Sequence, residues 1–404
     1  MSLNDTASGE RLHIGFFGLR NAGKSSLVNA VTGQELALVS EVKGTTTDPV
    51  KKAMELLPLG PVVIIDTPGV DDEGELGEMR VRKARQTLSQ TDLAVLVVDG
   101  PRGLQGPDRE LLALFRERNI PALVAYNKAD LVADRPALPE NSLWVNAVTG
   151  ENIHELKEAL GRLARPLEEG KRLVADLLTP GDRVVLVTPI DADAPKGRLI
   201  LPQQQVLRDV LDARCLALVC QPEELSAALA GLTERPRMVI TDSQAFGRVS
   251  REVPADLPLT SFSILFARYK GDLPTLVEGA ARLRGLKTGD PVLISEGCTH
   301  HRQCGDIGSE KMPRWIREYC GGEPKFSFSS GGDFPENLSD YALIVHCGGC
   351  MLNEKEMQYR IQSARAAGTP IVNYGVAIAQ MHGILRRSLE PFPQALALLD
   401  GADG

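Results

Sequence analysis

The sequence predicts an α/β protein in which an N-terminal domain is followed by two further α/β domains with parallel sheets. A chain of 404 residues is longer than one hydrophobic core usually supports, so more than one domain is expected. From Leu12 to about Leu163, short β-rich runs alternate with helical patterns, as in an open α/β sheet. A charged stretch containing Pro166 and Gly170 then indicates a linker. We expect a first domain over 1–168, a linker over 169–182, a middle domain over 183–260 and a C-terminal domain over 261–404.

Short hydrophobic runs give the expected elements of each domain. The first domain has expected strands at Leu12–Gly18, Val62–Asp66, Leu93–Asp99, Ala122–Tyr126 and Leu143–Ala147. The middle domain resembles a βαβ crossover, with strands at Arg183–Thr188, Cys215–Cys220 and Met238–Thr241 and a helix at Pro222–Leu232. The C-terminal domain has strands at Val292–Ser295, Tyr341–Val345 and Pro370–Tyr374, and a helix at Asn353–Ala367. Met357, Ile361 and Ala364 share one face of that helix, as a buried crossover requires.

Composition and charge exclude several classes of partner. The chain is 43% hydrophobic and 24% charged, which is ordinary for a globular protein. No apolar run reaches the roughly 18 residues that span a bilayer, so no membrane partner is expected. A net charge of -8 with scattered Lys and Arg leaves no basic stripe, so no nucleic-acid partner is expected either. Seven cysteines without an export signal indicate a reducing, cytoplasmic compartment, where clustered thiols are more often metal ligands than disulfides.

The run Gly18–Ser25 fits the phosphate-binding pattern G-x-x-x-x-G-K-[ST] and lies between a strand and a helix predicted over Ser26–Val31. Backbone N–H groups of such a loop hold phosphate oxygens, with help from the helix N-terminus. Lys24 is expected to meet the β and γ phosphates, and Ser25 to bind Mg²⁺. Taken alone, this loop would suit any nucleoside triphosphatase.

Later motifs select GTP. Asp66 closes a hydrophobic strand, where its carboxylate can hold the metal shell, and the Gly69 amide can contact the γ phosphate. The run Asn127–Asp130 follows another strand, and Asp130 can accept both N–H donors of the guanine edge, which adenine lacks. Asn146-Ala147 lies where such GTPases make a last backbone contact to guanine, although Asn replaces the more usual Ser. The first domain is therefore predicted to be a P-loop, Ras-like GTP-binding domain.

The run Gly44–Pro49 falls in the first switch region, and the order of motifs resembles the translation-factor-related GTPases that include the tRNA-modifying enzyme MnmE. Members of that subgroup have the sequence G-T-T-R-D at this position. Thr46 therefore matches their Mg²⁺-binding threonine, while Thr47 replaces their arginine. Asn21 matches the asparagine that helps to bind potassium. Val70 stands where Ras-type enzymes have a water-orienting glutamine, so we expect slow, switch-like hydrolysis stimulated by K⁺.

These motifs give a set of expected site residues in the first domain. The expected GTP-binding residues are Asn21, Ala22, Gly23, Lys24, Ser25, Ser26, Thr46, Asp66, Asn127, Lys128, Asp130, Asn146 and Ala147. Those expected to act in hydrolysis are Lys24, Thr46, Asp66 and Gly69. Ser25 and Thr46 are the expected Mg²⁺ ligands, and Asn21 the expected K⁺ ligand.

The C-terminal domain carries soft metal ligands after two of its expected strands. Cys298 and His300 follow the strand Val292–Ser295, and His346, Cys347 and Cys350 follow Tyr341–Val345. Because the carboxyl ends of parallel strands face one crevice, these segments are expected to converge. The two glycines between Cys347 and Cys350 allow a tight loop whose amides can hydrogen-bond to sulfur. Spacing alone leaves tetrahedral zinc and a 4Fe-4S cluster equally favoured.

The order of a GTPase domain, a middle domain and a C-terminal C-x-H…H-C-x-x-C pattern resembles the HydF family, the GTPase maturation factors of FeFe-hydrogenase. The similarity extends over the whole chain and includes the runs Val185–Asp191 and Cys298–Cys304. The resemblance implies a 4Fe-4S cluster on Cys298, Cys347 and Cys350 and a homodimer formed by the middle domain. It also implies a scaffold that carries a transient diiron precursor, made with two radical-SAM maturases, to apo FeFe-hydrogenase.

The fourth cluster ligand stays open at this stage. His300 and His346 are candidates, either as the fourth ligand or as hydrogen-bonding support, and His301 and Cys304 compete with them. We favour a labile fourth position, because it lets a preassembled fragment attach and leave. The main rival function is a tRNA-modification or ribosome-assembly GTPase with a structural zinc module. A metal-trafficking GTPase is a third possibility, although the chain lacks the His-rich tract expected of one.

Overall fold

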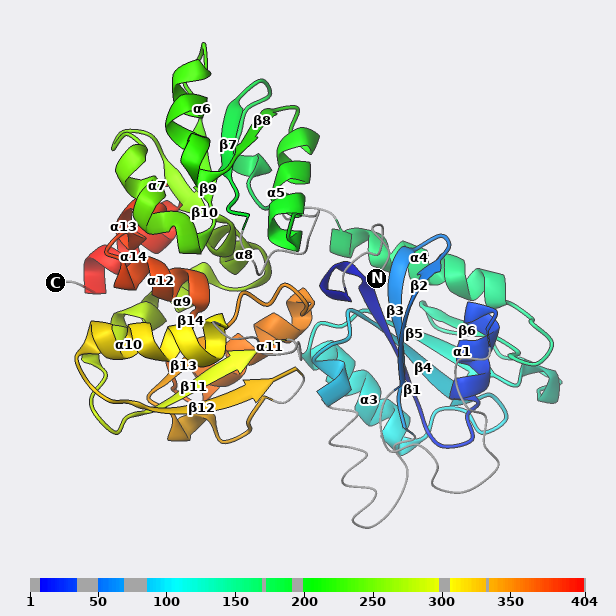
Figure 1. Cartoon of the computed structure of the whole chain (residues 1–404). Coiled ribbons are helices and arrows are strands. Elements are labelled where there is room, and N and C mark those ends of the chain that lie inside the picture. Colours follow the sequence, from blue (N-terminus) through cyan, green and yellow to red (C-terminus); the bar gives the residue numbers. More distant parts are fainter. Residues whose placement is uncertain are drawn as a thin grey trace. The chain divides into compact units, whose positions relative to one another are not determined.

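The structure is a computed structural model that describes residues 8–34, 50–68, 86–168, 172–190, 199–297, 306–331 and 334–402. It divides into two compact units, residues 1–170 and 171–404, which Figure 1 shows with their helices and strands labelled. Each unit is an α/β layered structure. Within the described ranges, no helix combines the length and apolarity that crossing a membrane requires.

The first unit contains a six-stranded sheet in the order β2-β3-β1-β4-β5-β6. All neighbours are parallel except β2, which pairs antiparallel with β3. The strands are β1 (Leu12–Phe17), β2 (Val50–Leu56), β3 (Gly60–Asp66), β4 (Leu93–Asp99), β5 (Ala122–Asn127) and β6 (Ser142–Trp144). The helices are α1 (Lys24–Thr32), α3 (Gly106–Glu117) and α4 (Ile153–Glu168), with short 3-10 turns at Ser8–Glu10 and η2 (Ala129–Leu131).

The central strands of this sheet are buried on both faces. Ile14 and Phe16 of β1 face the core formed with α1 and α4, whereas Phe17 faces the core formed with Phe115 of α3. Nearly continuous apolar runs are typical of such doubly covered parallel strands. The five predicted strands are confirmed, but the last is shorter than expected because Asn146 begins a turn after β6.

The second unit contains two four-stranded sheets of parallel strands, ordered β10-β9-β7-β8 and β12-β11-β13-β14. The first sheet has β7 (Arg183–Val187), β8 (Leu216–Cys220), β9 (Met238–Thr241) and β10 (Leu259–Ser261), with α5 (Leu201–Asp212), α6 (Leu225–Gly231), α7 (Phe246–Glu252) and α8 (Phe262–Lys270). The second has β11 (Pro291–Glu296), β12 (Lys325–Ser330), β13 (Leu343–His346) and β14 (Ile371–Asn373). Its helices are α9 (Leu273–Ala281), α10 (Met312–Cys320), α11 (Glu354–Ala366), α12 (Tyr374–Met381), α13 (Leu385–Ser388) and α14 (Pro393–Ala402). Shorter turns lie at Ala175–Leu177, Pro222–Glu224, Ser243–Ala245, Arg282–Gly285, Ile307–Lys311 and Leu338–Asp340.

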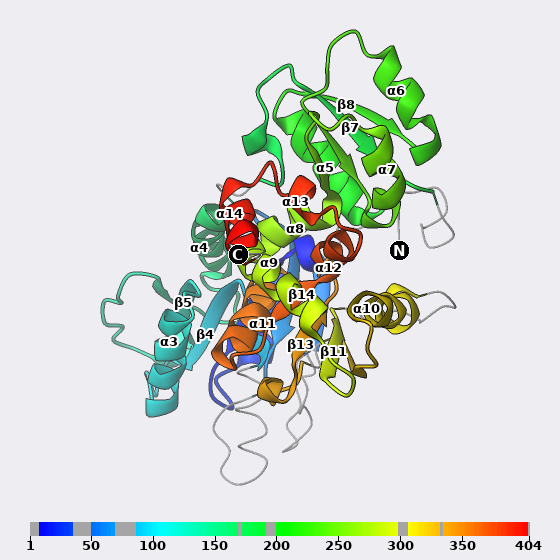
Figure 2. The same ribbon diagram turned by 90° about the vertical axis from the view of Figure 1, so that its left-hand side faces the viewer.

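The two sheets of the second unit share one buried core that runs from Leu173 to Leu399. Figures 1 and 2 show α13 and α14 beside α8 and α9, between the two sheets. Arg387 of α13 donates from Nη1 to Ser250 O (2.7 Å) and from Nη2 to Val253 O (2.9 Å), which ties the end of the chain to the first sheet. The core thus crosses the predicted boundary between residues 260 and 261, and that boundary stays a prediction.

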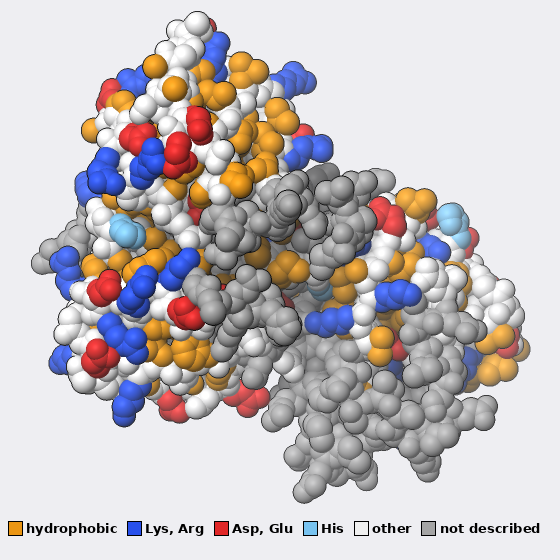
Figure 3. All heavy atoms as spheres, in the orientation of Figure 1, with side chains coloured by type: hydrophobic (Ala, Val, Ile, Leu, Met, Phe, Trp, Pro, Cys, Tyr) orange, Lys and Arg blue, Asp and Glu red, His pale blue; other side chains and the backbone are white. Residues whose placement is uncertain are grey.

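Strand β8 forms an edge of the first sheet and is poorly covered. Leu216, Leu218 and Val219 are 57%, 37% and 40% exposed, and Leu211 of α5 is also exposed nearby in sequence. Figure 3 shows hydrophobic side chains gathered over this part of the second unit. Cys215, just before the strand, is buried, while Cys220 at its end is half-buried.

Candidate functional site

The phosphate loop between β1 and α1 depends on two glycines. Gly18 has φ +143°, and a Cβ there would lie 2.2 Å from Val97 O. Gly23 has φ +87°, and a Cβ there would lie 2.2 Å from Nδ2 of Asn127. Helix α1 begins at Lys24, two residues earlier than predicted, and no side chain caps its N-terminus. A helix N-terminus without a side-chain cap is a place where phosphate can bind.

Lys24 and Asp66 are two charged groups at this loop. Lys24 is buried, and its Nζ donates to the carbonyl oxygens of Gly18 and Leu19, both at 2.9 Å. Ser25 Oγ donates to Asp66 Oδ2 at 2.8 Å, while Asp66 Oδ1 is buried with no partner among the described residues. Burial raises the pKa of Asp66, against the opposing effects of Ser25 and Lys24. A hydroxyl beside a carboxylate with an unused oxygen fits Mg²⁺, a hard cation that prefers oxygen ligands.

The loops predicted to bind guanine are fastened to the phosphate loop by Asn127, which is buried, and Lys128, which is half-buried. Asn127 donates from Nδ2 to Ala22 O (3.0 Å) and accepts at Oδ1 from the amide of Ala147 (3.1 Å). Lys128 Nζ donates to Asn21 O and to Asp99 Oδ2, both at 2.7 Å. Asn127 and Lys128 therefore link the phosphate loop, the end of β4 and the loop that contains Ala147. Asp130 is exposed on the short turn η2.

Asn146 forms the turn after β6 in place of the usual serine. Its Oδ1 accepts from the amides of Val148 (2.8 Å) and Thr149 (3.1 Å), which is the turn-forming bond that a serine hydroxyl makes. Its Nδ2 is buried without a partner in the described part of the chain. A buried orphan donor beside the base loops suits a ligand with acceptor atoms, as guanine has.

Several predicted site residues lie outside the described residues. These are Thr46 and Gly69 in the first unit, and Cys298, His300, His301 and Cys304 in the second. Ser26 lies in the first turn of α1, half-buried. Of the three predicted cluster cysteines, Cys347 and Cys350 are described, and within the described ranges no three His, Cys, Asp or Glu side chains form a metal-binding group.

Cys347 lies where β11 and β13 end side by side. Its amide donates to Ser295 O (2.9 Å), and its Sγ accepts from the amides of Gly297 (3.1 Å) and Gly349 (3.4 Å). Gly297 precedes Cys298 by one peptide bond, so the described chain brings the second cysteine segment to Cys347. A side chain at Gly297 would prevent this approach, because its Cβ would lie 2.5 Å from Leu352 Cγ.

Cys350 is held by a buried lysine that sequence reasoning missed. Lys270, at the end of α8, is 3% exposed, and its Nζ donates to Cys350 O (3.3 Å) and Leu352 O (2.9 Å). Burial raises the pKa of the Cys350 thiol, while Lys270 and the amides of Cys350 and Met351 oppose that rise. Amide donors and a buried cation favour the thiolate, the form that binds metals, although burial outweighs them at Cys350.

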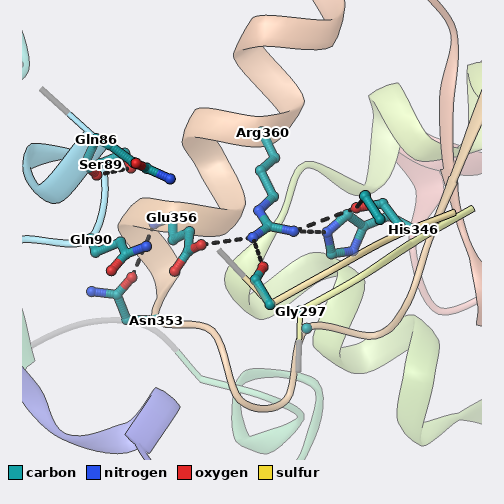
Figure 4. Close-up of polar contacts among 12 residues, drawn as sticks. Gln86, Ser89, Gln90, Gly297, His346, Asn353, Glu356 and Arg360 are labelled. Carbon is teal, nitrogen blue, oxygen red and sulfur yellow. Dashed lines mark hydrogen bonds and ion pairs between the residues drawn. The ribbon is translucent and has the colours of Figure 1, made fainter. Parts of the chain in front are cut away.

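His346 is wholly buried at the end of β13 and both of its ring nitrogens have protein partners. Arg360 Nη1 lies 3.1 Å from Nε2, and Nδ1 lies 2.8 Å from Cys347 O. Figure 4 shows Arg360 of α11 between Glu356 and His346. Burial, followed by the charge of Arg360, lowers the pKa of His346 to about 3, so the imidazole is neutral. A role as the fourth ligand stays a prediction.

Tyr374 and Glu296 form another polar pair near Cys347. The Tyr374 hydroxyl donates to Glu296 Oε1 at 3.3 Å, and Gly308 packs against both side chains. Burial, the sulfur of Cys347 and Glu296 raise the pKa of Tyr374. Sequence reasoning missed Tyr374, Glu296, Arg360 and Lys270. A weak signal existed for Arg360, since Glu356 lies four residues before it on a helix with a buried face.

Three family models match separate parts of this chain. One described as "50S ribosome-binding GTPase" matches residues 13–128. One described as "Hydrogen maturase F dimerization domain" matches residues 173–271, and one described as "Hydrogen maturase F tetramerization domain" matches residues 274–391. The first match covers the phosphate loop and the second and third cover the two sheets of the second unit.

Curated relatives match the GTPase part of the chain, and a solved structure covers a similar share of its length. The tRNA modification GTPase MnmE of Nitrosomonas europaea is 35% identical over 160 residues, which is 38% of this chain and 35% of the relative. That of Nitratidesulfovibrio vulgaris is 39% identical over 145 residues, which is 35% of this chain and 31% of the relative. The chain thus spans about a third of these relatives. A crystal structure of a probable GTP-binding protein engB is 26% identical, with a TM-score of 0.32 over 38% of this chain and 99% of that one. The first unit is a P-loop GTPase domain, as predicted.

Proposed function

The chain belongs to the hydrogen maturase F family, and from that premise we propose that it is a GTP-hydrolysing scaffold that binds a 4Fe-4S cluster. In this proposal it carries the diiron precursor of the hydrogenase active site, made with two radical-SAM maturases, to apo FeFe-hydrogenase in the cytoplasm. Two maturase F models together match more than half of the chain, whereas the MnmE relatives match the GTPase part alone. Family membership therefore favours maturation over tRNA modification.

The geometry of the first unit supports GTP and Mg²⁺ binding. Lys24 supplies a buried positive charge at the phosphate loop, and Ser25 and Asp66 offer oxygens for the metal. Asn127 and Lys128 fix the loop that carries the base-reading Asp130. We propose slow hydrolysis stimulated by K⁺ bound near Asn21. Turnover measured in K⁺ and in Na⁺ checks this, and equal rates would remove the potassium role.

One observation carries the cluster proposal: the Gly297 amide donates to Cys347 Sγ. Because Cys298 is bonded to Gly297, its segment starts at the described thiolate loop. Cys298, Cys347 and Cys350 would hold the cluster, and amide donors to sulfur are the usual support of such sites. When bound, a cluster with one iron open to exchange supplies an attachment point for an iron-containing fragment.

Self-association is proposed through the first sheet of the second unit. The model that matches residues 173–271 is described as a dimerization domain, and that region contains the exposed apolar edge strand β8. An uncovered strand presents unpaired N–H and C=O groups and is a template for pairing with another chain. We propose that the homodimer forms there, in keeping with the middle-domain role expected from the sequence.

Anaerobic reconstitution with iron and sulfide tests the cluster, with electron paramagnetic resonance and metal analysis as readouts. Cys347→Ser and Cys350→Ser should each lose the iron-sulfur signal. Cys320→Ser is the matched control, because Cys320 is a half-buried thiol at the end of α10 and should keep the signal. Stoichiometric zinc in place of iron, or full clusters in both loop variants, would contradict the proposal.

Coupling between nucleotide and delivery is tested separately. Lys24→Ala should leave cluster content unchanged, since Lys24 lies in the first unit, but should impair activation of apo FeFe-hydrogenase. Activation at the wild-type level by this variant would show that GTP does not control delivery.

A further inference from the structure

Arg360 is the largest fully buried side chain of the described structure, and it makes contacts with several neighbouring strand ends. Its Nη1 lies 3.1 Å from His346 Nε2 and 3.5 Å from Ser295 Oγ. Its Nη2 donates to Gly331 O (2.5 Å) and to Glu356 Oε1 (2.7 Å). One guanidinium on α11 thus contacts four groups, and Figure 4 shows it reaching from the helix toward His346.

Three of the four partners of Arg360 lie at the carboxyl ends of three adjacent strands, and the fourth, Glu356, lies on α11 itself. Ser295 is the second-to-last residue of β11, His346 is the last residue of β13, and Gly331 directly follows β12. Two of these strands lead into the cysteine segments, because Cys298 follows Ser295 by three residues and Cys347 follows His346 directly. Arg360 therefore joins the strand ends from which the sulfur ligands come.

Hydrogen-bond chemistry fixes the state of the imidazole between them. A guanidinium can only donate and a carbonyl oxygen can only accept. His346 must therefore accept at Nε2 from Arg360 and donate from Nδ1 to Cys347 O. Both nitrogens are used in this arrangement, so the ring links the guanidinium to the backbone of the first cysteine in the loop.

Stability alone does not account for this arginine. A buried ion pair is often no more stabilising than apolar side chains of similar volume. Arg360 pairs with Glu356, and its guanidinium lies 5.1 Å from the ring of Phe334. An apolar side chain of similar volume could therefore occupy the same buried space. Its Nε is also buried without a partner among the described residues, which costs free energy. The fork geometry of its two Nη atoms is what an apolar residue would lack.

We propose that Arg360 is a positioning residue for the thiolate site, which holds the ends of β11, β12 and β13 together and keeps His346 as a hydrogen-bonding link and not a metal ligand. The inference rests on the proposed function as far as the metal is concerned. The hydrogen bonds that Arg360 makes to the strand ends are present in the metal-free protein, so their role is tested both with and without iron.

The experiment compares Arg360→Lys, Arg360→Gln and His346→Gln with Arg365→Gln, a control at the exposed end of the same helix. In the metal-free protein, amide exchange over residues 343–352 should be at least tenfold faster in all three variants and unchanged in the control. After reconstitution, Arg360→Lys should keep the charge and the fold but bind less than half of the wild-type iron, with an altered paramagnetic spectrum. The double variant of Arg360→Gln and His346→Gln should be no worse than the weaker single variant.

The outcomes separate this inference from the function on which it rests. Wild-type exchange, iron content and spectrum in Arg360→Lys would overturn the inference, whether or not Arg360→Gln folds. A nitrogen coupling from imidazole on the wild-type cluster that disappears in His346→Gln would overturn the part concerning His346. Absence of iron in the wild type would defeat the proposed function. Amide exchange in the metal-free protein would still show whether Arg360 holds the strand ends together.

Discussion

The nucleotide site and the thiolate site both lie on glycine-containing loops at the carboxyl ends of parallel strands, yet they are held in different ways. In the first, the residues that hold the loops are also the motif residues: Asn127 and Lys128 bond to the backbone of the phosphate loop. In the second, Lys270 and Arg360 hold the cysteine loop from other helices. Cys347 Sγ accepts amide hydrogen bonds from Gly297 and Gly349, but the side chains that fasten the loop belong to residues outside the motif.

This difference predicts where substitutions act. In the nucleotide site, removing a motif residue should affect binding and loop structure together. In the thiolate site, removing a holding residue should affect the metal without removing any ligand. The following changes test that contrast, in order of decreasing effect.

Lys24→Ala should reduce GTP affinity by on the order of 100-fold, because it removes the buried positive charge at the phosphate loop. Calorimetric titration with a non-hydrolysable GTP analogue measures it. Lys157→Ala, on α4, is the control and should bind as the wild type does. If Lys24→Ala bound the analogue normally, Lys24 would be a structural residue and the first half of the comparison would be wrong.

Lys270→Met should lower reconstituted iron several-fold and destabilise the second unit by roughly 1–3 kcal/mol, because it leaves two buried carbonyl oxygens unpaired. Iron analysis and denaturant unfolding give the two numbers. Lys287→Met, at an exposed position, is the control. Full iron content in Lys270→Met would show that the cysteine loop needs no support from outside its motif.

Asn127→Ala should destabilise the nucleotide-free first unit by roughly 1–2 kcal/mol and weaken GTP binding as well, since one side chain joins two loops. Thermal unfolding without nucleotide separates the two effects. A variant that lost affinity but kept its melting temperature would show that Asn127 acts on the ligand alone.

Leu216→Lys should weaken self-association by about tenfold, because it places a charge on the exposed edge strand β8. Sedimentation at several protein concentrations measures the change. Iron content and GTP affinity should both stay at the wild-type level, since Leu216 belongs to neither site. An unchanged association constant would place the homodimer elsewhere on the molecule.

Sequence reasoning identified the parts of the fold whose residues repeat with a simple period. The buried strands of the first unit and the face of α11 formed by Met357, Ile361 and Ala364 were predicted and confirmed. Strand β2 was missed because its side chains are mostly exposed, so no alternation marks it. Helix α5 was missed because three glutamines precede its buried Val206 and Val210.

The site residues also divide into those that a sequence pattern marks and those that it does not. Glycine loops and polar motif residues carry recognisable spacing, so Lys24, Asp66 and Asn127 could be placed from the sequence. Arg360 and Lys270 could not, because a charged residue in a helix is usually exposed and only the packing of distant elements buries these two. Tertiary contacts over 80 residues of sequence, such as Lys270 to Cys350, leave no local signal.

The shared core of the second unit has a thermodynamic consequence. Since one apolar interior supports both sheets, the edge strand and the cysteine loop should melt in one calorimetric transition. Anything bound tightly by the native cysteine loop then raises the melting temperature of the association surface too. Loaded and empty forms would accordingly differ in heat tolerance as oligomers, even with identical contacts between subunits.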